Sequence, residues 1–420
     1  MTFLFRRIIC VCIVAVLAAC SSGGPQGGAT AVLPATSAQN ARTPFAARPQ
    51  AIDAYLVFTT GGALGTGSCY GSPTGVSEDP VETVSFAFQT VAVGYTNTCN
   101  NSPGGFTATN PLSTKGSTAS LTAKGCFPYA VNDKGEAVGG TGASAGRITQ
   151  AAYLKGAQCV ALPNLTGDSE SNAYAINDAG TIVGYSEQCG CGAMKHPVEW
   201  IDHKVIALSW GLGEAVGINK HGLIIGSVYD SKGNPTAAIW SGPNHVNLIG
   251  NLVPGTHLYG GQINDLGHAT MYGSSGTYFY NGTTATKITQ TLPGDGPFTP
   301  LGLDDQDNIY GISSTVGSRV VGKVHPASTT SHLVVDSGGT VTNMQTLVPP
   351  NVTLLPGVVT PGYGGSGLTV SGGTGIVVTP AQERIDNVAG KPGMGSHSRV
   401  QTETVFLIPP GCAPFVVRRR

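Results

Sequence analysis

One short motif recurs along the chain and constrains its fold more than any other feature. Its clearest copy is residues 174–186, which read YAINDAGTIVGYS. The apolar residues Ala175 and Ile176 end one strand, residues 177–180 turn the chain, and residues 181–186 return as a second strand. Asx side chains stabilise such turns by bonding nearby backbone amides, and Gly180 can adopt the positive φ that a short hairpin loop needs. The motif therefore predicts a β-hairpin.

Weaker copies of this hairpin follow one another at nearly constant spacing. The turn residue of each clear copy is Asn132, Asn177, Asn219, Asn264 or Asp304, so the intervals are 45, 42, 45 and 40 residues. A degenerate copy, in which the strand survives but the turn does not, lies at residues 87–96, and a weak seventh copy lies at residues 370–378. A period in this range is typical of propeller blades, whereas solenoids of similar period are helical.

Each repeat also carries two further apolar segments. The first of them ends about twenty residues after the turn, at Leu154, Trp200, Trp240 and Tyr280 in successive repeats, and a short second one follows, as at residues 205–208 and 246–248. Four strands fit within each unit, so we predict an all-β chain, a β-propeller of about seven four-stranded blades, with six or eight blades as open alternatives. A row of β-sandwiches would need roughly 100 residues per domain.

Propellers are often closed by a strand from one chain end that completes the blade begun by the other. Residues 55–59 and 404–408 are the candidate closing strands, and their pairing would protect the sheet edges. Between them we expect a Gly-rich loop that extends through Gly75, a Gly-rich run at residues 362–375, and a long surface loop at residues 381–398. The propeller is thus assigned to residues 51–410, and residues 411–420 form a C-terminal tail.

The repeat resembles that of the bacterial extracellular HAF repeat family, over roughly residues 85–345. The match is specific at residues 174–200, where His196-Pro197-Val198-Glu199-Trp200 stands in place of the His-Ala-Phe strand of the family. Elsewhere the chain departs from the pattern, because residues 150–152 and 236–238 lack the histidine and only His332-Leu333-Val334 keeps a comparable one. The resemblance implies an exported repeat protein, and the family carries no established activity.

The N-terminus reads as a lipoprotein signal. Residues 1–19 contain the basic pair Arg6 and Arg7, a short apolar run and the small-residue sequence Leu17-Ala18-Ala19 immediately before Cys20, which resembles the bacterial lipobox. This resemblance implies lipidation of Cys20, so that the partner there is a lipid membrane. Ser21 is not the aspartate that marks inner-membrane retention, which favours an outer-membrane lipoprotein, periplasmic or surface-exposed. Residues 20–50 are rich in Gly, Ala, Ser, Thr and Pro, and we expect a disordered tether.

Seven cysteines remain in the mature chain beyond Cys20. In an oxidising envelope they are disulfide candidates: Cys69, Cys99, Cys126, Cys159, Cys189, Cys191 and Cys412. Sequence alone does not give connectivity, and one thiol is left over. The suggested pairs are Cys99 with Cys126, Cys159 with Cys189 or Cys191, and Cys69 with Cys412.

Four further patterns contain residue types that can form chemical sites. Cys189, Cys191, Met194 and His196 form a soft ligand set suited to Cu(I), but oxidised thiols and a strand position for His196 argue against a metal. Residues 142–146 match the nucleophile-elbow pattern yet join two predicted strands, whereas an elbow joins a strand to a helix. Asp304, Asp305, Asp307 and Asn308 could suit Ca²⁺, although a solvated turn explains them better. Trp200, Trp240 and Tyr280 recur 40 residues apart, and could form a ring that stacks on sugars or the packing between blades.

Composition narrows the choice of function without deciding it. Charged residues make up 11% of the chain and the net charge is -1, so no basic face is available to bind phosphates, which argues against nucleic acid. We expect no cofactor. The favoured hypothesis is a non-enzymatic binding module for a glycan, a cell-wall component or a protein. The alternatives are an envelope hydrolase or lyase with acidic residues from several blades, and a structural or adhesive surface protein.

Overall fold

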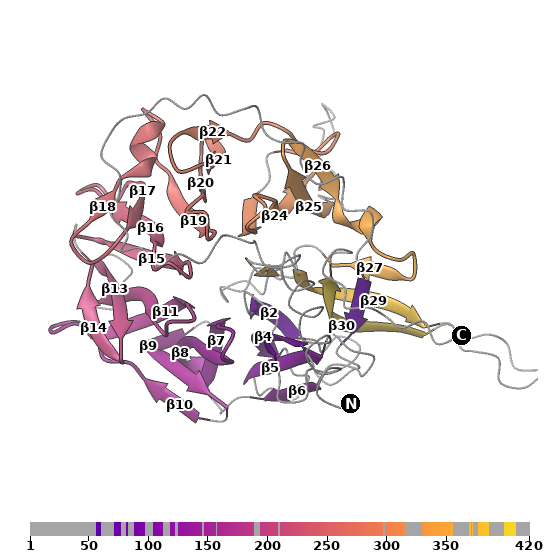
Figure 1. Ribbon diagram of the computed structural model, residues 1–420, viewed down its shortest axis with the longest axis horizontal. Coiled ribbons are helices and arrows are strands. Elements are labelled where there is room, and N and C mark those ends of the chain that lie inside the picture. Colours follow the sequence, from indigo (N-terminus) through magenta and orange to yellow (C-terminus); the bar gives the residue numbers. More distant parts are fainter. Residues whose placement is uncertain are drawn as a thin grey trace, which may run out of the picture.

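The computed structural model describes strands in the first quarter of the chain and longer continuous stretches after it. The described residues are 56–59, 71–76, 81–82, 88–96, 104–111, 118–121, 125–144, 147–156, 158–188, 194–208, 211–296, 299–315, 330–355, 369–370, 372, 377–385 and 399–408. Within them the strands form seven antiparallel sheets arranged around a common centre (Figure 1). The all-β fold and the propeller architecture with seven blades are therefore confirmed.

Six of the sheets, here blades 1 to 6, are consecutive in the chain, with the first strand of each nearest the centre (Figure 1). Blade 1 contains β2 (Gly71–Val76), β4 (Phe88–Thr96), β5 (Gly104–Pro111) and β6 (Thr118–Leu121), with β3 (Val81–Glu82) also paired to β4. Blade 2 contains β7 (Cys126–Val131), β8 (Glu136–Ser144), β9 (Arg147–Lys155) and β10 (Gln158–Ala161). Blade 3 contains β11 (Glu170–Ile176), β12 (Ile182–Glu187), β13 (Lys195–Ile201) and β14 (Lys204–Ala207).

The next three blades repeat this order. Blade 4 contains β15 (Gly213–Ile218), β16 (Ile224–Tyr229), β17 (Pro235–Trp240) and β18 (Val246–Asn247), followed by the 3-10 helix η1 (Ile249–Leu252). Blade 5 contains β19 (Tyr259–Ile263), β20 (Ala269–Gly273), β21 (Gly276–Tyr280) and β22 (Ala285–Lys287). Blade 6 contains β23 (Thr299–Leu303), β24 (Ile309–Ser314), β25 (Ser331–Ser337) and β26 (Thr340–Asn343), followed by η2 (Met344–Leu347).

Blade 7 closes the ring with strands from both ends of the chain. It contains β28 (Thr369–Val370), β29 (Val377–Ile385), β30 (Arg399–Ile408) and, at its outer edge, the N-terminal β1 (Leu56–Thr59), while β27 (Val352–Leu354) also pairs with β29. The partners Val57 and Leu407 lie in the register of β1 on β30. The inner strand β28 contacts β23 on one side and β2 on the other, so blade 7 bridges blades 6 and 1. The predicted closing strands are thus confirmed.

The hydrophobic core lies between neighbouring blades rather than in one central mass. Trp200 of blade 3 packs with Val138 and Ala151 of blade 2, and Trp240 of blade 4 packs with Val183 of blade 3. Both indoles are fully buried and Tyr280 is nearly so, within the cluster between blades 4 and 5. The recurrence of these rings therefore reflects packing between blades, and the alternative of a sugar-stacking ring at these positions is wrong.

Two expected loops contain strands. Residues 71–76 form the inner strand of blade 1, whereas the sequence predicts a Gly-rich loop through Gly75. Residues 381–385 belong to β29, whereas the sequence predicts a surface loop that begins at residue 381. The first segment is rich in Gly and Pro and the second carries charges, so neither shows the alternation that marks a half-buried strand; pairing with β4 and with β30 defines them instead. The weak seventh repeat is a real hairpin, because β28 pairs with residues 377–378 of β29.

Candidate functional site

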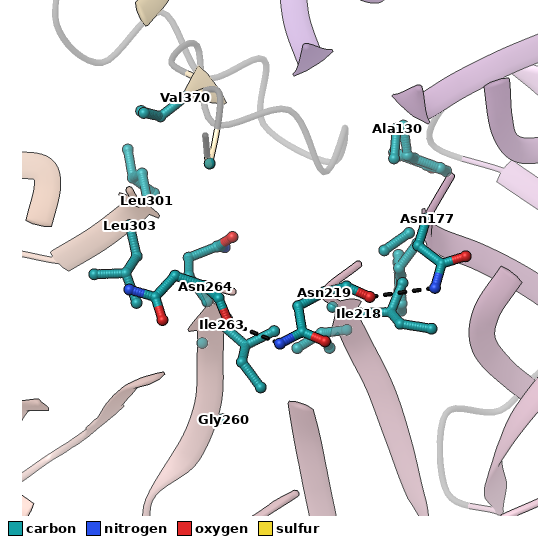
Figure 2. Close-up of a pocket in the computed structure, with 18 of the residues that line it drawn as sticks. Ala130, Asn177, Ile218, Asn219, Gly260, Ile263, Asn264, Leu301, Leu303 and Val370 are labelled. Atoms are coloured by element: carbon teal, nitrogen blue, oxygen red, sulfur yellow. Dashed lines mark hydrogen bonds between the residues drawn. The ribbon is translucent and has the colours of Figure 1, made fainter. Parts of the chain in front are cut away.

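A pocket, called here the channel, lies at the centre of the ring. Its volume is about 440 Å³, and it is lined by residues of the inner strands of blades 2 to 7 (Figure 2). Asparagine side chains surround one part of the wall, and tyrosines, including Tyr129, Tyr174 and Tyr272, line another. The asparagines connect neighbouring blades, whereas the tyrosines gather around charged side chains.

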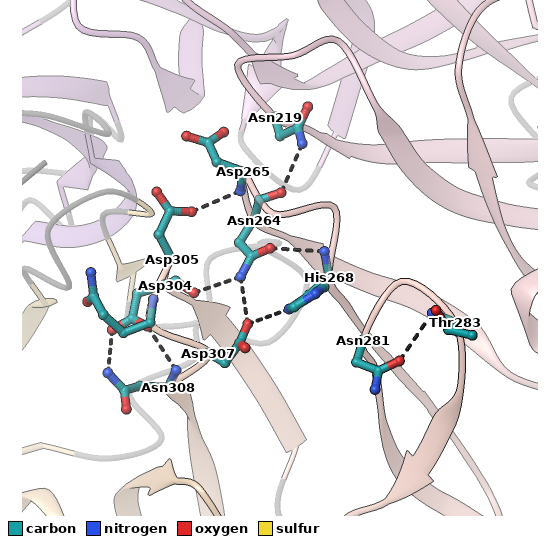
Figure 3. A network of polar contacts seen from close by, with 11 residues as sticks. Asn219, Asn264, Asp265, His268, Asn281, Thr283, Asp304, Asp305, Asp307 and Asn308 are labelled. Atoms are coloured by element: carbon teal, nitrogen blue, oxygen red, sulfur yellow. Dashed lines mark hydrogen bonds and ion pairs between the residues drawn. The ribbon is translucent and has the colours of Figure 1, made fainter. Parts of the chain in front are cut away.

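The asparagines form a continuous hydrogen-bonded belt from blade to blade, called here the Asn belt. In each case the side-chain Nδ2 donates to the backbone carbonyl oxygen of the turn residue in the next blade. The distance is 3.2 Å from Asn132 to Asn177, and it is 2.9 Å from Asn219 to Asn264 (Figures 2 and 3). The link from Asn177 to Asn219 is 3.2 Å and that from Asn264 to Asp304 is 2.9 Å. The belt therefore joins blades 2 to 6.

Each belt asparagine also stabilises its own turn. The Oδ1 atom of Asn219 accepts hydrogen bonds from the backbone N–H groups of His221 and Leu223, at 3.0 and 2.9 Å. Because the side chain uses Oδ1 within its turn and Nδ2 toward the next blade, only an amide meets both demands. The repeated asparagine is thus a turn former and a connector between blades.

The aspartate after the asparagine adds a second connection. Its Oδ1 accepts a backbone N–H from the preceding blade, from Asp133 to Asp178 at 2.8 Å and from Asp265 to Asp305 at 2.9 Å. Lys220 occupies this position in blade 4, where it donates its backbone N–H to Asp265 and forms an ion pair with the same carboxylate. These carboxylates have structural partners, which explains their recurrence without any catalytic role.

Asp304 takes the place of the belt asparagine in blade 6. Its Oδ1 accepts from the backbone of Gln306 and Asn308, and its Oδ2 accepts from the Asn308 side chain and the Tyr310 hydroxyl. Burial raises the pKa of Asp304 from 3.8 to about 6, against the effect of these hydrogen bonds. Because the carboxylate is directed inward and fully bonded, the turn does not present the open oxygen cluster that Ca²⁺ requires.

A bulge interrupts the first strand of every blade from 1 to 6. In blades 2, 3, 4 and 6 it skips the residue three positions before the turn residue, which is Tyr129, Tyr174, Val216 and Leu301 in turn. All four residues line the channel. A bulge leaves its extra residue outside the ladder and can redirect its side chain. The channel wall is therefore set by a backbone irregularity that recurs with the repeat.

Toward the end of the blades opposite the Asn belt lies a group of six tyrosines, called here the tyrosine cluster: Tyr129, Tyr174, Tyr185, Tyr229, Tyr259 and Tyr272. The ring of Tyr174 lies 6.0 Å from that of Tyr129 and 5.7 Å from that of Tyr185. Tyr259 and Tyr272 are cross-strand partners in blade 5 whose rings stack at 5.6 Å, and both are 37% exposed. The cluster thus combines buried and partly buried rings with an exposed pair.

Glu214 lies at the centre of this cluster. Its Oε1 accepts a hydrogen bond from the Tyr229 hydroxyl at 2.8 Å, and its Oε2 is 2.9 Å from the ammonium group of Lys195. That ammonium also lies 4.3 Å from the centroid of the Tyr185 ring. Lys195, Glu187 and Glu170 are aligned across β13, β12 and β11, so a row of charged residues borders the rings.

Four of the tyrosine hydroxyls stay protonated at any physiological pH. Burial, and after it the Glu214 carboxylate, raises the pKa of Tyr174, Tyr229 and Tyr272. Burial followed by Glu187 and Glu214 does the same for the pKa of Tyr185. These rings are therefore neutral groups that can donate hydrogen bonds and stack.

The candidate residues from the sequence are not brought together into a catalytic site. Residues 142–144 of the elbow-like pattern lie at the end of β8, which pairs with β9 and not with a helix, and residues 145 and 146 lie outside the described residues. His196 bonds Asp168 at 3.0 Å, and Met194 is exposed. Cys189 and Cys191 lie outside the described residues. Across the described stretches no group of three or more His, Cys, Asp or Glu side chains could hold a metal ion.

One disulfide is present among the described cysteines, and it differs from the suggested pairs. Cys126 of β7 is bonded to Cys159 of β10, with Cα atoms 6.5 Å apart. The suggested pairing of Cys126 with Cys99, and of Cys159 with Cys189 or Cys191, is therefore wrong, because the bond forms within one blade and folding decides which strands approach. Cys20, Cys69, Cys99 and Cys412 lie outside the described residues. In the part of the chain that the structure describes, no helix has the length and apolar character needed to cross a bilayer.

Sequence patterns mark the tyrosine cluster only weakly. One signal was present, because Tyr129 and Tyr174 share a position in their repeats, as do Tyr185 and Tyr272. The remaining two tyrosines, Tyr229 and Tyr259, have no such counterpart. Only the ring arrangement brings residues from four successive blades to one place.

Comparison with known proteins identifies no family for this chain. No protein-family model matches the chain, and no curated protein matches it. Among solved structures, the chain is similar to the beta-propeller domain of the Trilobed protease from Pyrococcus furiosus, described as having an open velcro topology. The identity is 12% and the TM-score 0.34, over 66% of this chain and 97% of that domain. The fold assignment rests on the sheets of this chain.

Proposed function

We propose that this chain is an exported, lipid-anchored β-propeller that binds a glycan of the cell envelope at the tyrosine cluster and does not turn it over. The observation that carries the proposal is the exposed, stacked pair Tyr259 and Tyr272 beside the channel. Aromatic faces of this kind stack on the apolar faces of sugar rings, and the neighbouring hydroxyl groups supply hydrogen bonds.

The hydrogen bonds that Glu214 already makes favour binding of a glycan over its hydrolysis. A glycosidase needs two carboxyl groups free to reach the scissile bond, one of them as an acid. Both oxygens of Glu214 are already taken, one by the Tyr229 hydroxyl and the other by Lys195. The carboxylate is thus positioned to hold the cluster together.

The anchor belongs to the same proposal and rests on the sequence. The lipobox-like residues 17–20 place a lipidated cysteine at the mature N-terminus, and the tether of residues 21–50 separates the propeller from the lipid. At roughly 5–6 Å × √n, a tether of this length holds the binding face a few nanometres from the membrane. Replacing Cys20 with alanine should release the protein from the membrane fraction, whereas a Cys20 variant that stays membrane-bound would contradict the anchor.

Binding can be tested directly with the full chain. We expect a glycan panel to yield at least one ligand, and Tyr272→Ala to weaken its binding about tenfold, because a stacked ring contributes about 1 kcal/mol or more. Leu266→Ala is the matched control, since Leu266 is 55% exposed but lies in the turn after Asn264, beside the Asn belt. Equal losses in the two variants, or turnover of the ligand, would contradict the proposal.

A further inference from the structure

We propose that the tyrosine cluster selects glycans that carry a free amine, so that its ligand is an amino sugar polymer rather than a neutral or acidic one. This inference rests on the proposed glycan binding and specifies the chemical class of the ligand.

Among the described residues, the charge around the rings is predominantly negative. Glu170, Glu187 and Glu214 lie close enough to influence the tyrosines, since all three contribute to the raised pKa of Tyr185. The ammonium group of Lys195 lies among these carboxylates and pairs with Glu214. A partly buried site with more carboxylates than ammonium groups attracts cations and repels anions.

The aromatic rings also favour a cationic ligand. Neutral tyrosines present the negative face of their π-systems, to which an ammonium group is attracted within about 6 Å. The raised pKa values of Tyr174 and Tyr229 are consistent with neutral rings, and the Tyr229 hydroxyl donates its hydrogen to Glu214. An amino sugar offers both groups that the cluster fits, an apolar ring face for stacking and an ammonium for the carboxylates.

Lys195 shows that the cluster already holds an alkylammonium group. Its Nζ is 2.9 Å from Glu214 and 4.3 Å from the centroid of Tyr185, which is the geometry of a cation held between a carboxylate and an aromatic face. The Lys195 side chain is 21% exposed, so this cation lies near the solvent-accessible edge. A ligand amine would bind beside it, at the exposed rings of Tyr259 and Tyr272.

The test compares two oligomers that differ in one group. Glucosamine oligomers and N-acetylglucosamine oligomers of the same length and linkage are titrated into the full chain by calorimetry. We expect the glucosamine oligomer to bind at least tenfold more tightly, and its advantage to shrink as salt is raised, because salt screens the interaction between ammonium and carboxylate groups.

Two charge variants give opposite expected changes. Glu170→Gln removes one carboxylate and should weaken glucosamine binding several-fold, with no effect on the N-acetylated oligomer. Lys195→Met removes the internal ammonium and should strengthen glucosamine binding. Changes that are equal for both oligomers would overturn the inference.

The outcomes also separate the inference from the function on which it rests. If the two oligomers bind equally well and lose affinity equally in Tyr272→Ala, selection for the amine is refuted and glycan binding stands. If neither oligomer nor any other member of the glycan panel binds, both are refuted.

Discussion

The bulge in β11 explains why the residue that faces it in β12, Gly184, is a glycine. A methyl group at this position would overlap the carbonyl of Asn172 in β11, and the equivalent Gly139 and Gly226 meet the backbone of their own first strands in the same way. The bulge brings the backbone of the first strand onto the second, where only a hydrogen atom fits. Blade 5 has Met271 at this position, and there the irregularity in β19 extends from Gly260 to Ile263.

Replacing Gly184 with alanine should therefore cost more than an ordinary glycine substitution. Gly180, in the same hairpin, has φ +85° and open space around it, so Gly180→Ala meets only backbone strain, about 1–2 kcal/mol. Gly184→Ala must separate two paired strands as well, and its loss in free energy of unfolding should exceed that of Gly180→Ala. Urea denaturation of the two variants measures both, and a smaller loss for Gly184→Ala would refute the steric argument.

Asp305 provides a prediction about pH. Burial raises its pKa from 3.8 to about 6, and the nearby Asp265 carboxylate adds to the effect. The folded state thus binds more protons than the unfolded state between about pH 4 and 6, and the contribution of Asp305 to stability falls as pH rises through this window. Asparagine at this position keeps the Oδ1 that accepts from Asp265 and removes the titration.

Relative to the unsubstituted chain, Asp305→Asn should gain about 1–3 kcal/mol between pH 4 and pH 7. The measurement is urea denaturation at several pH values. Asp230→Asn is the control, because hydrogen bonds from Asn234 lower the pKa of Asp230, and its difference should run in the opposite direction. A difference for Asp305→Asn that does not vary with pH would be inconsistent with the raised pKa.

At the scale of the element, one asparagine in the hairpin that opens each of blades 2 to 5 both stabilises its own turn and bonds the next blade. Asn219 bonds its own turn and the carbonyl of Asn264 in the next blade, whereas Asn281 bonds only the backbone and side chain of its own turn among the contacts described (Figure 3). The two asparagines share the turn chemistry and differ in the link between blades. They form a matched pair for testing the Asn belt.

Asn219→Ala should lower the free energy of unfolding by about 2–4 kcal/mol, because it removes the turn bonds and one of the two donors to the buried Asn264 carbonyl, which then keeps only the Gly267 N–H. Asn281→Ala should cost about 1 kcal/mol, as expected for a turn residue whose side-chain hydrogen bonds are exposed to solvent. Urea denaturation compares them. Equal costs would mean that the bond to the next blade contributes nothing.

At the scale of the whole molecule, the ring depends on pairing between the two ends of the described chain. β1 is the outer strand of blade 7, where it pairs with β30 along four residues. Without it, β30 becomes an edge with unpaired backbone groups, which is a template for pairing with another chain.

A chain that begins at Thr60, just after β1, should therefore melt at lower temperature than one that begins at Gln50, and should associate in solution. Thermal denaturation and size-exclusion chromatography of the two chains provide the test. Equal melting temperatures with both chains monomeric would show that closure by β1 does not stabilise the ring.

The sequence by itself determined most of the strands, the turns of the clear repeats and a count of about seven repeats, because these depend on local rules. Asx residues with glycine specify each hairpin within a few positions, apolar segments such as those that end in Trp200 and Trp240 mark the later strands, and the period counts the blades. It also placed the closing strands at residues 55–59 and 404–408. Inner strands such as β2 cannot be predicted in this way, because segments rich in Gly and Pro show no alternation of apolar and polar residues.

Only the tertiary structure decided which residues meet. The disulfide between Cys126 and Cys159, the Asn belt and the tyrosine cluster each join positions that are tens of residues apart, and their partners are set by the curvature of the ring and by the bulges in its inner strands. Spacing along a chain fixes how often a residue recurs. It does not fix which side chains converge on one end of a channel, because that depends on the direction in which the backbone aims each of them.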